Sequence, residues 1–275
     1  MQYHGERGYG GWGGGIGFPR AGSTVKTLII INVAIFVLQA LLGGRVRLAA
    51  YLGVRADLVV EHLWVWQVFT YMFLHSLGHL FHIIMNMLLL YWFGTELERL
   101  LGRRRFLMLY LGGGVVGGLA YCLTQYLARS QQPAIGASAA VMALLVVYAI
   151  HFPNRTILLF FLIPMTIKWF VIMILGIDLL YSLTSYHDGV AHTAHLGGAL
   201  FGFLFWRHGR AVEDFFARLQ DRAHEREATQ LADDEKRMDE ILAKISREGF
   251  DSLTRRERQF LEDQSRKRRD RGYRG

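Results

Sequence analysis

Two polar residues stand out because each lies in an apolar stretch where a polar side chain is unusual. Ser138 is in the tetrapeptide Gly136-Ala137-Ser138-Ala139 at the head of one such stretch, and His195 is near the head of another, in Ala194-His195-Leu196-Gly197-Gly198. Polar groups inside a membrane are expensive and usually face a cavity or the interior of a helix bundle. A hydroxyl and an imidazole on separate helices can act as a nucleophile and its general base. The pair therefore predicts nucleophilic catalysis at membrane depth.

The segments that carry these residues are apolar and close to the length that crosses a bilayer. Hydrophobic residues make up 52% of the 275-residue chain, and about 20 apolar residues span the hydrocarbon core as a helix. Six such segments can be recognised, at approximately 27–42, 79–94, 106–128, 138–150, 167–186 and 189–206. The sequence predicts an all-α integral membrane protein, with a six-transmembrane-helix bundle followed by a short helical cytoplasmic tail.

The basic residues indicate a topology rather than a nucleic-acid surface. The formal net charge is +8, but Lys and Arg gather near the ends of alternate apolar segments, as in the inner loops of membrane proteins. These residues are Arg7, Arg20, Lys26, Arg99, Arg103 to Arg105, Arg155 and Arg207. Three arginines in the long loop after the first segment oppose the trend but are outnumbered. Both termini are therefore expected in the cytoplasm, and no nucleic acid is expected as a partner.

The composition divides the chain into three parts. Residues 1–23 contain a glycine-rich stretch without the pattern of a cleavable signal peptide, residues 24–207 hold the apolar segments, and residues 208–275 form a charged tail. Apolar residues at helical spacing, a terminating Gly249 and a capping box at 254–257 predict a helical hairpin at 235–266. The tail is expected to bind either a cytoplasmic protein or anionic lipid. The single cysteine excludes an intrachain disulfide.

The predicted topology places four polar side chains at one depth. With the N-terminus inside, the second, fourth and sixth helices all enter the membrane from the outer face. His82 and Asn86 lie in the opening turns of the second helix, Ser138 begins the fourth, and His195 follows about two turns into the sixth. We expect them to converge at a cavity open to the outside, where water, the second substrate of a hydrolase, can reach them.

Small residues indicate how the helices that carry Ser138 and His195 approach each other. Gly198 and Gly202 follow His195 by three and seven residues, so they lie on the same helical face. Gly136, with three alanines at 139, 140 and 143, gives the other helix a small-residue surface. Close packing of the two helices is therefore expected to bring Ser138 to His195.

Taken in order, these segments resemble the rhomboid proteases. The matching segments are Trp66–Thr70, His82–Asn86, Phe93–Gly94, Glu96–Glu98, Gly136–Ala139, Phe152–Arg155, and Ala194–Gly198 with Gly202. A Gly-x-Ser tetrapeptide alone is a weak signal. The same tetrapeptide between a His-x-x-x-Asn helix and an Ala-His-x-Gly-Gly helix is specific. The resemblance covers most of the membrane region and implies an intramembrane serine protease that uses no cofactor and no metal.

The resemblance also implies a role for each residue. Ser138 would be the nucleophile and His195 the general base of a dyad, with packing rather than a third carboxylate holding the imidazole. His82, Asn86 and the backbone N–H of Ser138 would donate hydrogen bonds to the oxyanion of the tetrahedral intermediate. The N–H of Ser138 suits this role because the first turn of a helix leaves its donors unpaired.

Two residues depart from the commonest rhomboid pattern. Ala139 follows the nucleophile where glycine is usual, so its methyl group would narrow the approach of substrate or shift the oxyanion geometry. In the first outer loop, Trp66-Gln67 replaces the usual Trp-Arg pair, which puts in doubt what that arginine contributes to stability.

The position of the nucleophile implies the substrate class. A serine recessed among helices reaches only a chain that enters sideways from the lipid bilayer or bends in from the outer surface. The expected substrates are transmembrane segments of other membrane proteins, cut near their outer ends, where Gly, Pro and small residues weaken the helix. The lack of targeting signals and the six-span form predict a bacterial plasma membrane, with the active site towards the outer face.

Three other interpretations remain open. The chain could be a catalytically silent rhomboid-like protein that binds membrane-protein clients, although its mark would be loss of Ser138 or His195. It could be a small transporter, but it shows neither internal repeats nor a charge pathway beyond Asp178, which could equally be an interfacial carboxylate. A metal site is disfavoured because no His-Glu-x-x-His pair is present; it would use His75, His79, His82, His192 and His195.

Overall fold

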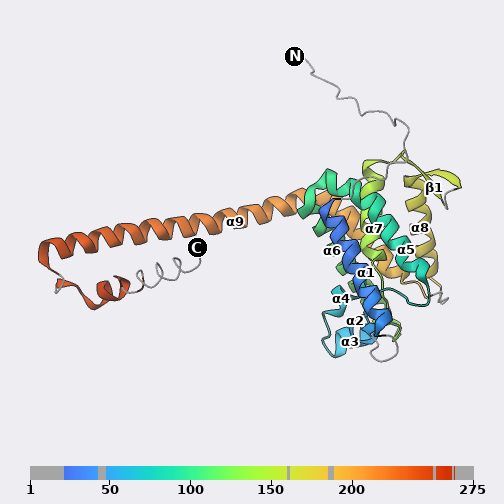
Figure 1. Ribbon diagram of the computed structural model, residues 1–275, viewed down its shortest axis with the longest axis horizontal. Coiled ribbons are helices and arrows are strands. Elements are labelled where there is room, and N and C mark those ends of the chain that lie inside the picture. Colours follow the sequence, from blue (N-terminus) through green and yellow to red (C-terminus); the bar gives the residue numbers. More distant parts are fainter. Residues whose placement is uncertain are drawn as a thin grey trace, which may run out of the picture. The chain divides into compact units, whose positions relative to one another are not determined.

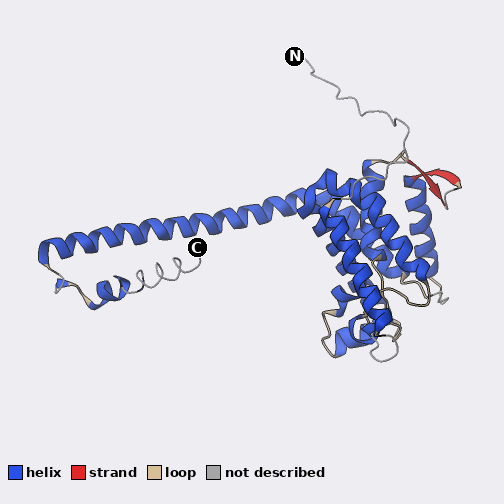
Figure 2. Ribbon diagram, viewed as in Figure 1, coloured by secondary structure: helices blue, strands red, loops and turns tan. Residues whose placement is uncertain are grey.

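The structure is a computed structural model that describes residues 22–42, 48–159, 162–184, 189–249, 252–261 and 263. The glycine-rich segment predicted at 1–23 lies outside the described residues except for its last two positions, as does the end of the predicted hairpin. The chain divides into two compact units, Met1–Arg207 and His208–Gly275. Helices dominate both units (Figure 2).

The first helix, α1 (Ser23–Leu41), is an apolar run whose N-terminus is capped by a distant carboxylate. Its own first residues provide no side-chain cap, and Glu98 accepts hydrogen bonds from the backbone N–H groups of Thr24 and Val25, both at 3.0 Å. A negative charge at this end also interacts favourably with the helix dipole. Glu98 thus joins the start of α1 to the helix that follows the second apolar segment.

The loop after α1 is folded, as its length suggests. It contains α2 (Leu48–Leu52), α3 (Ala56–Glu61), α4 (Gln67–Thr70) and the 3₁₀ turn η1 (Tyr71–Phe73). Gln67 is fully buried, accepts a hydrogen bond from the backbone N–H of Arg55 at 3.1 Å and donates one to the carbonyl of Tyr51 at 3.2 Å. The side chain that replaces the usual arginine therefore still ties together two parts of this loop.

The next helical stretch changes character twice. It runs as α5 (Leu80–Leu89), a π-helical turn η2 (Leu90–Gly94) and α6 (Thr95–Leu127). At Gly102 the backbone is non-helical, with φ +76° and ψ 163°, which kinks the stretch between the predicted second and third membrane segments. Glycine adopts this φ without the steric penalty that other residues meet.

The remaining elements surround α7 (Ser138–His151), which contacts α5, η2, α6 and α8 (Ile167–Ser182). Figure 1 shows α1, α5, α6, α7 and α8 packed side by side. Nearly every residue of α7 is buried. The helix that carries Ser138 is thus the centre of the first unit, and its small residues admit neighbouring backbones. The last helix, α9 (His192–Glu248), continues far beyond the apolar segment predicted to end at residue 206.

One element was not predicted. Strands β1 (Thr156–Leu159) and β2 (Ile163–Thr166) form an antiparallel pair in which Thr156 lies opposite Thr166 (Figure 2). Their β-branched threonines and isoleucines favour this conformation. The pair is a small addition to a mostly helical fold, which agrees with the predicted all-α class.

Part of the chain has the length and composition of membrane-spanning helices. Among the described residues, two helical stretches are long and apolar enough to cross a membrane, Ser23–Leu41 and Leu80–Leu127, and Ser138–His151 is a shorter apolar helix. Helices occupy all six predicted apolar positions, but the number of six membrane spans stays a prediction.

The second unit contains a helical turn-back. Gly249 ends α9 with φ +83°, and a further helix occupies 255–261. Thr254 and Glu257 make the reciprocal hydrogen bonds of a capping box, and Lys244 pairs with Glu257. These bonds from Thr254 and Lys244 lower the pKa of Glu257 to about 2.

Candidate active site

The segment before Ser138 has a conformation that only glycine adopts easily. Gly136 has φ +128°, and its N–H donates to the carbonyl of Tyr71 at 3.0 Å. A Cβ on Gly136 would lie 2.6 Å from Nε2 of His82 and 3.7 Å from Oγ of Ser138. The glycine therefore lets the imidazole of His82 lie over the backbone next to the serine. This is a more specific role than the helix packing expected for Gly136.

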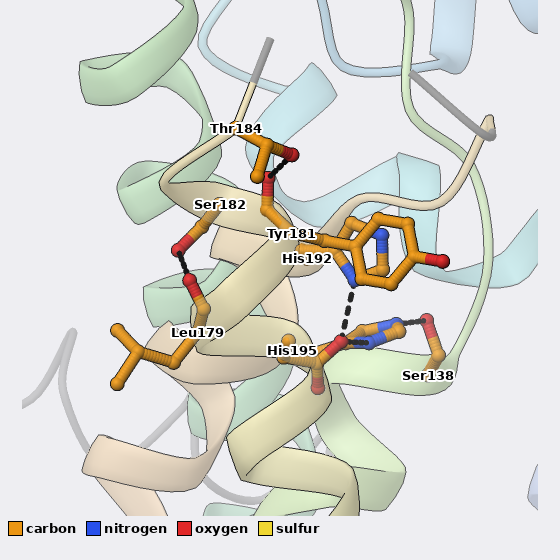
Figure 3. A network of polar contacts seen from close by, with 8 residues as sticks. Ser138, Leu179, Tyr181, Ser182, Thr184, His192 and His195 are labelled. Atoms are coloured by element: carbon orange, nitrogen blue, oxygen red, sulfur yellow. Dashed lines mark hydrogen bonds and ion pairs between the residues drawn. The ribbon is translucent and has the colours of Figure 1, made fainter. Parts of the chain in front are cut away.

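Ser138 and His195 are joined by a hydrogen bond. Nε2 of His195 lies 2.8 Å from Oγ of Ser138, and both residues are partly buried. This is the geometry in which an imidazole can remove the proton of a hydroxyl nucleophile. Figure 3 shows the hydroxyl of Ser138 pointing to the imidazole of His195.

Close backbone contact between α7 and α9 sets this distance. A Cβ on Gly198 would lie 2.0 Å from the carbonyl oxygen of Ala139, and one on Gly202 would lie 2.6 Å from that of Ala143. Real Cβ atoms essentially never come closer than 3.0 Å to such atoms. The two predicted glycines therefore lie at the helix contact that holds His195 against Ser138.

The methyl group of Ala139 packs against α6. Ala139 is 1% exposed, and a Cβ on Gly117 of α6 would lie 2.5 Å from the Ala139 Cβ. The methyl group thus fills the interface between α6 and α7. The glycine of α6 accommodates the departure from the usual pattern.

The structure brings His82 to the serine and places Asn86 one turn further along α5. Asn86 is 5% exposed, and its Nδ2 donates to the carbonyl of His82 at 2.8 Å. One N–H of the amide is therefore engaged within α5, and the amide has a second N–H. No hydrogen bond joins Asn86 to Ser138 in the part of the chain that the structure describes.

The ring of His75 packs against the ring of His82. The two rings meet edge to face with centroids 5.2 Å apart, and the side chain of Gln39 exchanges two hydrogen bonds with the backbone of His75. Burial, with a smaller contribution from His82, lowers the pKa of His75 to about 4. The ring of His75 is therefore neutral at ordinary pH and supports His82 by packing.

A carboxylate contacts the imidazole of His195, although none was expected there from the sequence. Asp178 of α8 is 3% exposed, and its Oδ1 lies 3.0 Å from Nδ1 of His195. The same oxygen lies 2.7 Å from Nδ1 of His192. Asp178 is therefore buried against two imidazoles rather than placed at an interface with water. It contacts the ring nitrogen of His195 that faces away from Ser138.

Tyr181 completes this row of side chains. Its ring stacks on that of His192, with centroids 4.9 Å apart and 24° between the planes, as Figure 3 shows. The sequence held a signal for this arrangement: Asp178 and Tyr181 are three residues apart on one helix, and His192 and His195 are three apart on another. The two faces meet only if α8 and α9 are aligned in the right way, and the spacing of residues along the sequence does not show that alignment.

The same three residues are those that could hold a metal. Within the described residues, ligand atoms of Asp178, His192 and His195 lie within 4.8 Å of one another. This group differs from the histidine set considered from the sequence, because it uses a carboxylate and excludes His75, His79 and His82. Both histidines already bond to Oδ1 of Asp178.

The fold and site define a class: a helical membrane protein with a serine, an imidazole and a carboxylate in line at one end of its bundle. Comparison with known families agrees. The Rhomboid domain family matches residues 62–208, and a family of unknown function (DUF6576) matches residues 228–267 of the tail. The first match covers more than half of the chain, so the chain belongs to the rhomboid family, as its motifs predicted.

Several curated proteins are similar in sequence. "RHOMBOID-like protein 12, mitochondrial" of Arabidopsis thaliana is 34% identical over 146 residues, 47% of this chain and 43% of that protein. "Rhomboid protein 1, mitochondrial" of Saccharomyces cerevisiae is 32% identical over 199 residues, 69% of this chain and 54% of that protein. The human "Presenilin-associated rhomboid-like protein, mitochondrial" is 30% identical over 146 residues, 51% and 38% of the two chains. The chain thus spans about half or less of the length of these relatives.

These names contradict one prediction from the sequence. A bacterial plasma membrane with both termini in the cytoplasm was expected, and that prediction is wrong by this comparison, because the similar proteins are mitochondrial. Basic residues at the ends of alternate helices distinguish the two sides of a membrane but do not identify the membrane.

Proposed function

We propose that the chain is an intramembrane serine endopeptidase. The observation that carries the proposal is the 2.8 Å hydrogen bond between Oγ of Ser138 and Nε2 of His195, held by glycine contacts between two apolar helices. Ser138 attacks the carbonyl carbon of the scissile peptide bond while His195 takes the hydroxyl proton. His195 then returns the proton to the leaving amine. Water hydrolyses the acyl-enzyme by the same proton transfers in reverse order.

Donors around Ser138 suit the oxyanion of the tetrahedral intermediate. The backbone N–H of Ser138 lies at the N-terminus of α7, where donors have no partner within the helix and the dipole favours negative charge. His82 lies across Gly136 from the serine, and the second N–H of Asn86 is the other candidate donor. These groups would be fixed before the reaction, which is what makes such donors effective.

The substrate class is the transmembrane segment of another membrane protein. The residues of the site come from the starts of α5, α7 and α9, so the site lies at one end of the helices and is approached from the bilayer or from that membrane surface. A segment bound there must unwind before its peptide bond can be attacked, because helical hydrogen bonds shield it. We therefore expect cleavage near Gly, Pro or small residues at the corresponding end of the substrate helix.

The alternative is a rhomboid-like protein that binds clients without cutting them. Such a protein needs a surface that binds a client segment but not an activated serine. The two functions are separated by reaction with a serine-directed fluorophosphonate, which requires a nucleophilic hydroxyl and no knowledge of the substrate.

The test compares the detergent-solubilised protein with four variants. Ser138→Ala is expected to abolish labelling, and His195→Ala is expected to reduce it to a slow but measurable residual rate. The matched controls are Ser182→Ala, whose hydroxyl donates to the carbonyl of Leu179, and His151→Ala, whose ring bonds to the carbonyl of Val147. Both controls are expected to label at the wild-type rate. A folded wild type that does not label would refute the protease and leave the client-binding protein.

A further inference from the structure

We propose that Asp178 is a positioning residue that fixes the tautomer and orientation of His195, and that His192 holds Asp178 in place. The inference rests on the proposed protease activity and deepens it. The site then contains an ordered row of hydrogen bonds, His192 to Asp178, Asp178 to His195 and His195 to Ser138, instead of a dyad held by packing alone.

The geometry determines which nitrogen of His195 carries the proton. A carboxylate oxygen only accepts hydrogen bonds, so Nδ1 at 3.0 Å from Asp178 must donate. Nε2, at 2.8 Å from Oγ of Ser138, is then left with its lone pair facing the hydroxyl. This is the tautomer that a general base needs. The negative charge of Asp178 also favours the imidazolium that forms when the serine attacks.

The burial of Asp178 argues against a purely interfacial role. At 3% exposure the carboxylate has little contact with water, and a buried charge is costly unless it is paired and hydrogen-bonded. Within the described residues, Oδ2 has no hydrogen-bond partner, and both histidines bond to Oδ1. All the polar contact of this side chain is thus directed at the two imidazoles.

His192 bonds to the same oxygen of the carboxylate as His195 does. Its Nδ1 donates to Oδ1 at 2.7 Å, the shorter of the two bonds, and its ring is stacked on Tyr181. Tyr181 lies on the same helix as Asp178, one turn further on. The stack therefore fixes His192 relative to α8, and His192 fixes the rotation of the carboxylate.

The decisive variant is Asp178→Asn, which keeps the shape and removes the charge. An asparagine that presents its amide oxygen to the imidazoles preserves the tautomer but not the charge. One that presents its NH₂ forces the proton of His195 onto Nε2, where it blocks the base. Either orientation lowers the rate of fluorophosphonate labelling of Ser138, by about 100- to 10,000-fold given the loss of about 10⁴ seen when an orienting carboxylate becomes an amide in serine proteases.

Two further variants separate positioning from folding. In the His195→Ala background, Asp178→Asn is expected to add nothing to the defect, because a residue that acts through His195 has no effect without it. His192→Phe keeps a ring on Tyr181 and removes one hydrogen bond to a charged group, so labelling is expected to slow by about tenfold. The matched control is Glu96→Gln, which removes a carboxylate bonded to Tyr148 and Arg155 instead of to the site.

The outcomes are distinct. A wild type that labels, with Asp178→Asn slowed at least 100-fold while its thermal unfolding matches that of Glu96→Gln, supports the inference. Labelling of Asp178→Asn within threefold of wild type overturns the positioning role of Asp178 and leaves the protease intact. A full additional loss of labelling when Asp178→Asn is added to His195→Ala has the same meaning. Labelling that a chelator abolishes and Zn²⁺ restores would also overturn it, in favour of a metal held by the same three residues. An unlabelled wild type refutes the proposed function itself and this role with it.

Discussion

The contact between Gly198 and Ala139 controls how closely α9 approaches α7, and Gly198→Ala tests how much catalysis depends on it. A Cβ on Gly198 would lie 2.0 Å from the Ala139 carbonyl oxygen, whereas ordinary contact begins at 3.4 Å. The difference means that the two backbones must separate by about 1.4 Å. Ser138 precedes Ala139 directly, and His195 lies one helical turn before Gly198. The 2.8 Å bond between them would therefore exceed the hydrogen-bond limit of about 3.2 Å.

The expected loss is larger in activity than in stability. A displacement of about 1 Å in a reacting group can lower a rate about 100-fold, and overpacking of a tight interface typically destabilises by about 1–3 kcal/mol. We expect Gly198→Ala to fold in detergent and to label with fluorophosphonate about 100-fold more slowly than wild type. The control is Gly176→Ala in α8, where a Cβ meets nothing within 4 Å. Alanine there should stabilise the helix by about 0.5–1 kcal/mol without changing the labelling rate.

A graded result would strengthen the argument. Gly202→Ala meets the Ala143 carbonyl oxygen at 2.6 Å and lies a further turn from the serine, so it should slow labelling less than Gly198→Ala. Two results would contradict this expectation: labelling of Gly198→Ala within threefold of wild type, or equal slowing of labelling by Gly176→Ala. Either result would mean that helix contact does not set the distance between Ser138 and His195.

Three further predictions concern other parts of the first unit. Asn86→Ala should lower the rate of substrate hydrolysis by about 100- to 1,000-fold if its second N–H stabilises the oxyanion. The control is Asn32→Ala, which should leave hydrolysis unchanged. Like Asn86, Asn32 donates from its side chain to the carbonyl four residues earlier. Glu98→Gln should lower the free energy of unfolding by about 1–2 kcal/mol, measured by thermal unfolding in detergent, because it removes the charged cap of α1. His75 should make the protein less stable in acid, because its pKa is about 4 in the folded protein and near 6.5 in the unfolded chain. As the pH drops from 6.5 towards 4, the unfolded chain binds the proton first. The free energy of unfolding therefore falls over this range, by up to about 3 kcal/mol. Within the described residues neither ring nitrogen of His75 has a hydrogen-bond partner, so His75→Phe should fold and lose this pH dependence; an unchanged acid transition in that variant would assign it to other groups.

The helix contacts around the serine could be predicted because they follow from period and residue size. The spacing of Gly198 and Gly202 from His195 defines one face, and the alanines of α7 define its partner. Two apolar helices that each carry a small-residue surface can pack in few ways other than by close contact between those surfaces. The order of the motifs along the chain predicted where the site lies, because it places the starts of three helices at one end of the bundle.

Other features depend on contacts that the local sequence does not encode. The capping of α1 by Glu98 joins residues more than seventy positions apart. The burial of Gln67 and the packing of the Ala139 methyl group on Gly117 depend likewise on distant partners. The expected end of the last apolar segment marks a change in composition, but α9 continues past it. Helix formation follows local propensity, which the charged residues of the tail satisfy as well as apolar ones do.

Asp178 shows why a single carboxylate in an apolar helix is difficult to interpret from sequence. Placed alone near the end of α8, it is consistent with an interfacial charge, and only its distances to His192 and His195 distinguish the two interpretations. A buried cluster of two imidazoles and a carboxylate contributes little net stability, because desolvation of the charge offsets the attraction. A protein that only binds clients gains nothing from placing such a cluster behind a serine. A protease gains a base of fixed tautomer, so the burial of Asp178 favours the enzyme over the client-binding protein independently of the Ser138–His195 bond.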